Sequence, residues 1–290
     1  MVRLGVVILP EHRWRAGADL WRRAEALGFD HAWTYDHLAW RTLRDSPWFA
    51  AIPTLTAASL ATDSIRIGPL VASPNYRHPI PFAKELATLD EISGGRLTVG
   101  IGAGGYGWDA TVLGAQPLPP RGRAARFVEF VEVLDGALRN ESFSYRGTYF
   151  SADEARNPGC VQQPRVPFVI AATGDRGMHV AARFGDGWAT TGEGELSGPA
   201  GLDQSLEAVR RQVARLEKAC RELDRDPATV ARFAVTGPRL DSGLGSRSAF
   251  RDALDRYRDA GITDVVVHWP RPTEPYAGDV RAFERIVASR

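Results

Sequence analysis

The sequence predicts one closed (β/α)8 barrel, the TIM-barrel architecture, over residues 1–290. A helix, a glycine turn and a short apolar strand recur along the chain, and eight such strands can be counted. Strands that alternate with helices in this number favour a closed parallel barrel over an open sheet. The length of 290 residues is compatible with one domain, because barrels of about 250 residues fold as one unit.

Two copies of the repeat are especially clear. One runs over Ala24–Thr34 and the other over Tyr257–His268. In each copy a glycine, Gly28 or Gly261, is expected in the left-handed conformation just past the helix, and the apolar run that follows suits a strand buried on both faces. The full set of copies predicts strands near residues 3–9, 30–34, 65–71, 97–101, 167–172, 186–190, 230–235 and 263–268.

The longer connections depart from this repeat. A hairpin-like insertion of about 142–166 separates the fourth and fifth units. Gly- and Pro-rich connections at 104–123, 192–202 and 237–248 each follow the carboxyl end of a predicted strand. Barrel enzymes build their sites at that end, so these connections are expected to border the functional site.

The composition excludes several classes of partner. Lysine plus arginine (36) nearly balances aspartate plus glutamate (35), which predicts a small-molecule ligand rather than nucleic acid or an anionic membrane. No apolar signal or membrane-spanning segment is evident, and the two cysteines, Cys160 and Cys220, indicate a cytoplasmic protein without structural disulfides.

Both lysines, Lys84 and Lys218, fall in helical stretches, which disfavours Schiff-base chemistry. The strand ends carry too few histidines and carboxylates for a metal centre, and none is expected.

One region carries a recognisable pattern. Val71–Pro79 reads VASPNYRHP, and Leu89–Gly104 reads LDEISGGRLTVGIGAG. A second block comprises Val169–Gly174 and Ala181–Trp188. In combination these segments resemble the luciferase-like oxidoreductases, and the likeness covers roughly residues 1–190. The C-terminal third matches only in its βα rhythm.

The resemblance implies an oxidoreductase that uses a flavin or a deazaflavin. The segment Tyr35–Trp40 is similar to the Asp-His…Trp segment of deazaflavin-dependent dehydrogenases of sugar phosphates and secondary alcohols. This likeness favours coenzyme F420, a deazaflavin, with FMN as the alternative. It places His37 near the reacting carbon, and a histidine can exchange a proton at neutral pH. Asp36 is a second catalytic candidate; the alternative is that Asp36 and His37 simply cap the next segment or pair with each other.

The chain departs from those dehydrogenases at one point. Gly105 stands where they place a glutamate, which puts sugar-phosphate oxidation in doubt. Asp109 is the nearest carboxylate and is the third catalytic candidate, with helix capping as the alternative.

The resemblance also implies a cofactor-binding set. A bulge in the third strand, often with a non-proline cis bond, would press on the ring of the cofactor, and glycines after the fourth strand would allow close approach of the backbone. The turn after the fifth strand would bind the cofactor phosphate at a helix N-terminus. Ordinary strand ends, a tight turn and a solvated arginine are the alternative interpretations. The candidates are Leu70, Val71, Ala72, Gly102, Ala103, Gly104, Ala172, Thr173, Gly174 and Arg176.

Aromatic residues in strand-end connections predict a wall for the substrate. The candidates are Trp14, Trp40 and Trp108, together with His268 at the end of the eighth strand. Trp21, Trp33 and Trp188 are better explained as core residues.

Three hypotheses follow for the function. The first is hydride transfer between F420 and a small organic substrate, the second is an FMN-dependent monooxygenase that uses oxygen, and the third is a cofactor-binding protein without turnover. A homodimer is expected from the family likeness and from the apolar helical stretches 49–61 and 80–92.

Overall fold

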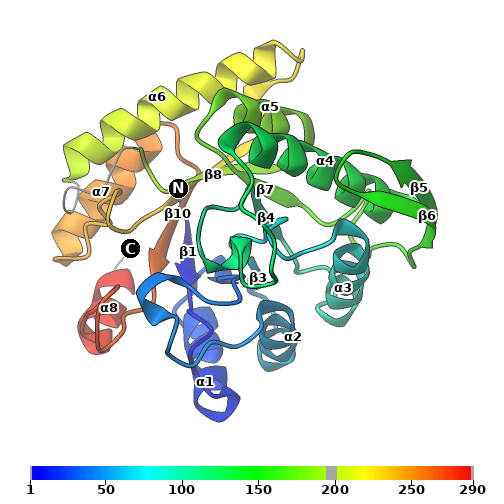
Figure 1. The fold of residues 1–290 in the computed structure, drawn as a ribbon. Coiled ribbons are helices and arrows are strands. Elements are labelled where there is room, and N and C mark those ends of the chain that lie inside the picture. Colours follow the sequence, from blue (N-terminus) through cyan, green and yellow to red (C-terminus); the bar gives the residue numbers. More distant parts are fainter. Residues whose placement is uncertain (1, 194–200, 289–290) are drawn as a thin grey trace.

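The structure, a computed structural model, describes residues 2–193 and 201–288. Within these residues, eight parallel strands pair in the order β3-β2-β1-β10-β9-β8-β7-β4. The two ends of this order meet through bridges from Ile67 to Leu97 and from Ala72 to Ile101, so the sheet closes into the predicted barrel (Figure 1). The strands are β1 (Arg3–Val7), β2 (His31–Thr34), β3 (Arg66–Pro69), β4 (Val99–Gly102), β7 (Phe168–Ala171), β8 (Gly187–Thr190), β9 (Ala231–Val235) and β10 (Asp264–His268).

Helices surround the barrel, and each of the predicted strands overlaps an observed one (Figure 1). A short antiparallel pair, β5 (Ser142–Arg146) and β6 (Ser151–Arg156), follows the long fourth helix. Residues 194–200 of the predicted connection 192–202 lie outside the described part of the chain. The helices are α1 (Trp14–Ala26), α2 (Ala51–Ala61), α3 (Pro79–Ile92), α4 (Pro120–Arg139), α5 (Asp175–Phe184), α6 (Leu202–Arg221), α7 (Arg247–Asp259) and α8 (Val280–Val287), with single 3-10 turns at Arg41–Leu43, Trp108–Ala110 and Pro227–Thr229.

The glycine turns explain how helices pass into strands. Gly28 and Gly261 have φ angles of 76° and 90°, which confirms the left-handed position predicted after α1 and α7. The Leu89–Gly104 motif forms the same kind of turn at the end of α3, and side-chain hydrogen bonds also hold it in place. Asp90 accepts hydrogen bonds from the backbone and side chain of Gln162, and Arg96 donates to the backbone carbonyls of Ser59, Thr62, Ile65 and Ser93. These two charged residues of the motif therefore have structural roles.

Side chains alternate along each strand and form two hydrophobic cores, one between the sheet and the helices and one inside the barrel. Val265 and Val267 of β10 point outward and pack among the helices, whereas Val266 points into the barrel. In β7, Ile170 packs outward and Val169 inward. This period of two is the pattern of a sheet buried on both faces, and it explains the continuous apolar runs in the sequence.

The amino ends of the strands are closed by a buried polar cluster. His31 Nε2 lies 3.0 Å from Asp264 Oδ1, and the Trp33 indole donates to His31 Nδ1 over 2.6 Å. Arg3 adds two hydrogen bonds to the same carboxylate. Burial opposes ionisation of Asp264, but the hydrogen bonds from His31 and Arg3 outweigh it and lower the pKa of this carboxyl to about 2. These side chains therefore fill the amino end of the barrel around Asp264.

Among the described residues, no helix combines the length and the apolar character that crossing a membrane requires.

Candidate active site

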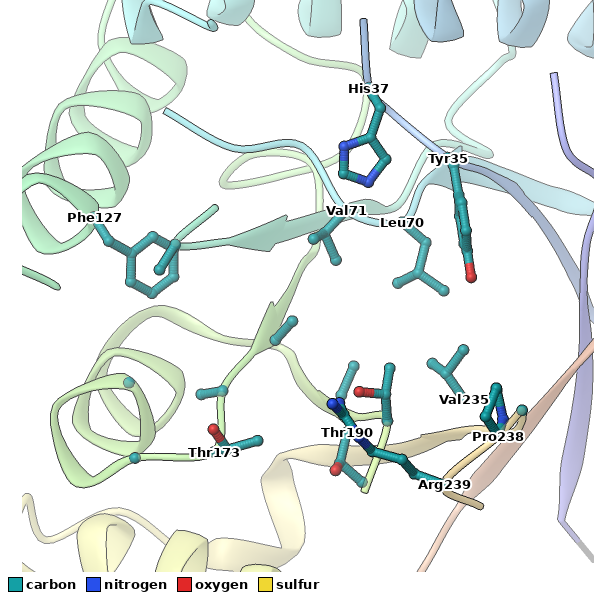
Figure 2. Close-up of a pocket in the computed structure, with 18 of the residues that line it drawn as sticks. Tyr35, His37, Leu70, Val71, Phe127, Thr173, Thr190, Val235, Pro238 and Arg239 are labelled. Atoms are coloured by element: carbon teal, nitrogen blue, oxygen red, sulfur yellow. The ribbon is translucent and has the colours of Figure 1, made fainter. Parts of the chain in front are cut away.

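A cavity of about 720 Å³ opens at the carboxyl ends of the strands (Figure 2). This volume lies within the range of cofactor and ligand sites, roughly 300–1,000 Å³. Apolar side chains form much of its wall, and polar groups come from a few points on different elements. The apolar contributors include Trp40, Leu70, Val71, Ala103, Ala124, Phe127, Val128, Ala171, Ala172, Ala189, Val235 and Pro238.

The end of β3 forms one side of this cavity. The peptide bond between Leu70 and Val71 is cis, as the resemblance implied, and both side chains line the cavity. Figure 2 shows them below the ring of His37. Ala72, predicted to contact the cofactor, is instead buried and pairs with Ile101 of β4, because it belongs to the contact that closes the barrel.

Packing requires glycine at Gly102, the last residue of β4, and at Gly104. A Cβ on Gly102 would lie 2.7 Å from Val71 Cγ2, and a Cβ on Gly104 would lie 2.6 Å from Cγ of Asn75. Gly104 also has a φ angle of 73°, which disfavours any other residue. Of the three candidates at this strand, only Ala103 lines the cavity.

The turn between β7 and α5, predicted to bind the cofactor phosphate, borders the cavity. Ala172, Thr173, Gly174 and Arg176 all line the cavity. Among the described residues, no side chain caps the N-terminus of α5, and a Cβ built on Gly174 would meet none of their atoms within 4 Å. The free N–H groups of the first turn of α5 are therefore open toward the cavity and can bind an anion.

His37 and Asp109 form a pair at the mouth. His37 Nδ1 lies 2.5 Å from Asp109 Oδ2, and the Leu38 N–H donates to the other carboxylate oxygen over 2.8 Å. Asp109 is buried, whereas the His37 side chain is 29% exposed and lines the cavity. Since an ionised carboxylate can only accept, Nδ1 carries the proton, and Nε2 of neutral His37 is left as an acceptor. Figure 2 shows the ring pointing into the cavity.

Asp36, the second catalytic candidate, does not share this position. It is buried and does not line the cavity; the Tyr76 hydroxyl donates to it, and Arg77 Nη2 and Nε donate over 2.8 and 3.0 Å. These hydrogen bonds occupy both carboxylate oxygens. Tyr35 and His37 line the cavity while the residue between them does not, because side chains alternate along extended backbone. Asp36 is thus a structural anchor for the segment that carries His37.

A polar chain of three side chains lines the wall beside His37. Tyr35 Oη lies 2.8 Å from His268 Nε2 and 3.1 Å from Tyr276 Oη, and the rings of His268 and Tyr276 stack at 3.6 Å. Burial lowers the pKa of His268 to about 3, only partly opposed by a hydrogen bond to the Thr236 backbone. Burial also raises the pKa of Tyr35, so the tyrosine is the donor and His268 is a neutral acceptor. His268 lines the cavity as predicted, but its ring nitrogens are already engaged.

The tryptophan predictions separate into two groups. Trp40 lines the cavity and stacks on Tyr276 and Trp48 at ring distances of 6.2 and 6.3 Å. Trp14 and Trp108 do not line it. Trp14 is exposed at the start of α1. Trp108 is also exposed, and the guanidinium carbon of Arg44 lies 4.1 Å from the centre of its ring. Sequence position beside a strand end does not fix the direction of a side chain, which is why these two residues do not line this cavity.

Several wall residues carry no sequence signal that would have revealed them. Phe127 comes from the middle of an ordinary amphipathic pattern in α4, and Thr190 is the last residue of β8. The strand ends themselves are the only general indication, since they meet at one end of a barrel. The wall residues that were missed are Tyr35, Arg41, Ala124, Phe127, Val128, Ala171, Asp175, Gly177, Ala189, Thr190, Thr191, Val235, Thr236, Gly237, Pro238, Arg239 and Tyr276.

The fold and the cavity together define a class, a (β/α)8 barrel whose carboxyl end holds a large, mainly apolar cavity with an open helix N-terminus. The chain belongs to the luciferase-like monooxygenase family, whose sequence profile matches residues 2–240. This finding confirms the resemblance predicted from the motifs.

Individual relatives and structures agree with this assignment. The chain is 34% identical over 206 residues to an F420-dependent glucose-6-phosphate dehydrogenase of Beutenbergia cavernae, a match that covers 69% of this chain and 59%, under two thirds, of that protein. It is 28% identical over 276 residues to the F420-dependent hydroxymycolic acid dehydrogenase of Mycobacterium tuberculosis, covering 92% of this chain and 69% of the relative. A solved F420-dependent secondary alcohol dehydrogenase superposes with a TM-score of 0.81 at 19% identity, covering 99% of this chain and 97% of the other. At this identity the structural likeness shows the fold alone.

Proposed function

We propose that the protein is an F420-dependent oxidoreductase that transfers hydride between the coenzyme and a small organic substrate. The observation that carries this proposal is the His37–Asp109 pair at an apolar cavity whose far side is an open helix N-terminus. The named activities of the relatives support the choice of F420, as do the family and the segment Tyr35–Trp40.

The residues present fit such a coenzyme. The apolar side chains of Leu70 and Val71 offer a surface for a flat ring, and Ala171 and Ala189 leave room on the wall because they are small. The uncapped turn at Thr173 and Gly174 suits a phosphate group. Arg176 lies in the first turn of α5 and can add a charge-assisted hydrogen bond.

The protein itself provides a group that accepts and returns one proton. When bound, F420 supplies two-electron hydride chemistry. His37 Nε2 would accept a proton from the substrate as the substrate loses hydride, or return it in the opposite direction. Asp109 holds the proton on Nδ1, orients the ring and stabilises the imidazolium that forms when Nε2 is protonated. The buried wall around Tyr35 and His268 keeps water from one side of this position.

An anaerobic turnover assay tests the proposal. The protein is mixed with reduced F420 and a panel of aldehydes, ketones and enones, and oxidation of the coenzyme is followed by its absorbance. In parallel, reduced FMN is supplied with oxygen and the same panel. Turnover without oxygen in the first assay supports the proposal, whereas oxygen-dependent product formation with FMN alone would assign the protein to the monooxygenases.

We also propose that the protein is a homodimer through α2 and α3, which lie beside each other (Figure 1). Helix α2 contains no charged residue, yet its Leu60 is 75% exposed, and Ile92 at the end of α3 is also exposed. Exposed apolar side chains on neighbouring helices are typical of an interface.

A further inference from the structure

Positive charge is in excess on the wall of the cavity. Among the described residues that line it, three are arginines, Arg41, Arg176 and Arg239, and one is a carboxylate, Asp175; Arg41, Arg176 and Asp175 are exposed, whereas Arg239 is half-buried. A half-buried guanidinium group that faces a mainly apolar cavity without a partner costs free energy, and among the three this applies to Arg239. The surplus therefore indicates an anionic ligand.

The proposed coenzyme accounts for one of these arginines. Arg176 belongs to the first turn of α5, next to the Thr173–Gly174 turn that would hold the coenzyme phosphate. Proton transfer by His37 requires no arginine. Arg41 and Arg239 are left without a function in the coenzyme site or in the chemistry.

Arg239 is held in place but lacks a partner. Its side chain extends from the segment after β9 into the cavity, toward Thr190 (Figure 2). Gly192 packs on its stem, since a Cβ on Gly192 would lie 2.9 Å from Arg239 Cβ. The Nε atom is buried with no hydrogen-bond partner among the described residues, and the side chain forms no ion pair with any of them.

Arg41 approaches the cavity near the same wall. It follows Trp40, and its guanidinium lies over the Trp40 ring at 5.1 Å. Its charge acts on the hydroxyls of Tyr35 and Tyr276. Tyr276 in turn adjoins Gly237, two residues before Arg239, because a Cβ on Gly237 would lie 3.4 Å from the Tyr276 ring. Arg41 thus lies beside Tyr35 and Tyr276, and the segment that carries Arg239 passes Tyr276 at Gly237, whereas Arg176 belongs to α5.

We propose that Arg239, assisted by Arg41, binds an oxyanion of the substrate, a carboxylate or a phosphate group, so that the substrates are organic anions. This inference rests on the proposed function, because Arg41 and Arg239 are assigned to the substrate only if Arg176 and the α5 turn bind the coenzyme. The planar fork of arginine suits both groups, since it can donate two parallel hydrogen bonds to a carboxylate or phosphate. The charge of the substrate then contributes to its orientation beside His37.

Anion-dependent thermal unfolding tests the inference. Melting temperatures of the F420-loaded protein are measured against sodium phosphate and sodium acetate, with chloride keeping the ionic strength constant. Phosphate or acetate should raise the melting temperature saturably in the wild type. Arg239→Met should weaken the apparent affinity at least ~10-fold, as expected for loss of a charged hydrogen bond, and Arg41→Met should weaken it less. Arg146→Met, an exposed arginine of β5, is the matched control and should behave as wild type.

The outcomes separate this inference from the proposed function. An unchanged anion effect in Arg239→Met, or no anion effect in the wild type, would overturn the inference. A tenfold loss of F420 affinity in Arg239→Met, measured by coenzyme fluorescence, would assign Arg239 to the anionic groups of the coenzyme and would also overturn it. If the wild type does not bind F420, the proposed function fails, and the anion titration of the coenzyme-free protein still tests Arg239.

Discussion

At the scale of single residues, the chemistry depends on how His37 is held. Asp109 fixes the Nδ1 proton, and the Trp48 indole donates to the His37 carbonyl over 2.8 Å, so both the ring and its backbone are anchored. The remaining nitrogen faces the cavity. This arrangement leads to two predictions, one for the ring itself and one for the carboxylate behind it.

Replacement of the ring removes the proton carrier. We expect His37→Ala to lower turnover by roughly 10²–10⁴-fold while F420 affinity changes little, because the proposed ring and phosphate contacts come from other residues. Steady-state rates and coenzyme fluorescence titration measure the two quantities. His12→Ala is the control, since His12 is exposed and does not line the cavity. Near-normal turnover of His37→Ala across neutral pH would exclude His37 as the proton carrier.

Replacement of Asp109 should act through His37. We expect Asp109→Asn to lower kcat by about 10–10²-fold with little change in coenzyme affinity, because a neutral amide stabilises the imidazolium less than a carboxylate does. The ¹⁵N chemical shifts of His37 provide a direct readout: the Nδ1-protonated tautomer should dominate the neutral ring in the wild type and lose that dominance in the variant. Asp45→Asn, at an exposed position, should leave both readouts unchanged. An unaltered tautomer in Asp109→Asn would contradict the assigned role.

At the scale of elements, the end of β10 gives the wall a pH-dependent stability. His268 has a pKa of about 3 in the folded protein against its ordinary value of 6.5. The unfolded chain therefore binds more protons between these two values, so His268 reduces stability as the pH falls from 6.5 toward 3 and has no such effect above 6.5.

The matched variant is His268→Gln, which retains a donor and an acceptor but does not titrate. Relative to this variant, the wild type should lose on the order of 1.4 kcal/mol of unfolding free energy per pH unit in that window. Urea unfolding at several pH values measures the difference. Parallel stability curves for the two proteins below pH 6 would show that His268 is not buried in its neutral form.

The elements also show where sequence reasoning was sufficient. The strands and their turns were predictable because each glycine turn and each apolar run is a local pattern, as at Gly28 and Val265–His268. The position of Thr173 and Gly174 in a turn before a helix, at the cavity wall, was predictable for the same reason. The pairing of His37 with Asp109 joins residues 72 positions apart and carries no local signal. Asp36 was a catalytic candidate because its segment resembles one in the family, but it does not line the cavity, because alternation turns neighbouring side chains to opposite sides.

At the scale of the whole molecule, the proposed dimer buries the apolar surface of α2 and α3. We expect the wild type to have the mass of a dimer at micromolar concentration, and Leu60→Glu to weaken association at least ~10-fold, because it places a charge in an apolar contact. Light scattering coupled to size exclusion measures the mass. Leu223→Glu, at another exposed leucine after α6, should remain a dimer. A wild type that is monomeric at all concentrations would contradict the proposed interface.

The central claim, that the carboxyl end of the barrel is an F420 site, is tested most directly by equilibrium binding of the oxidised coenzyme. Titration of F420 fluorescence should give saturable binding to the wild type and weaker binding of FMN. Gly174→Leu should weaken F420 binding at least ~10-fold with an unchanged melting temperature, because the side chain would enter the open space in front of the α5 N–H groups. Absence of F420 binding, tighter binding of FMN, or unchanged F420 affinity in a folded Gly174→Leu variant would contradict the account.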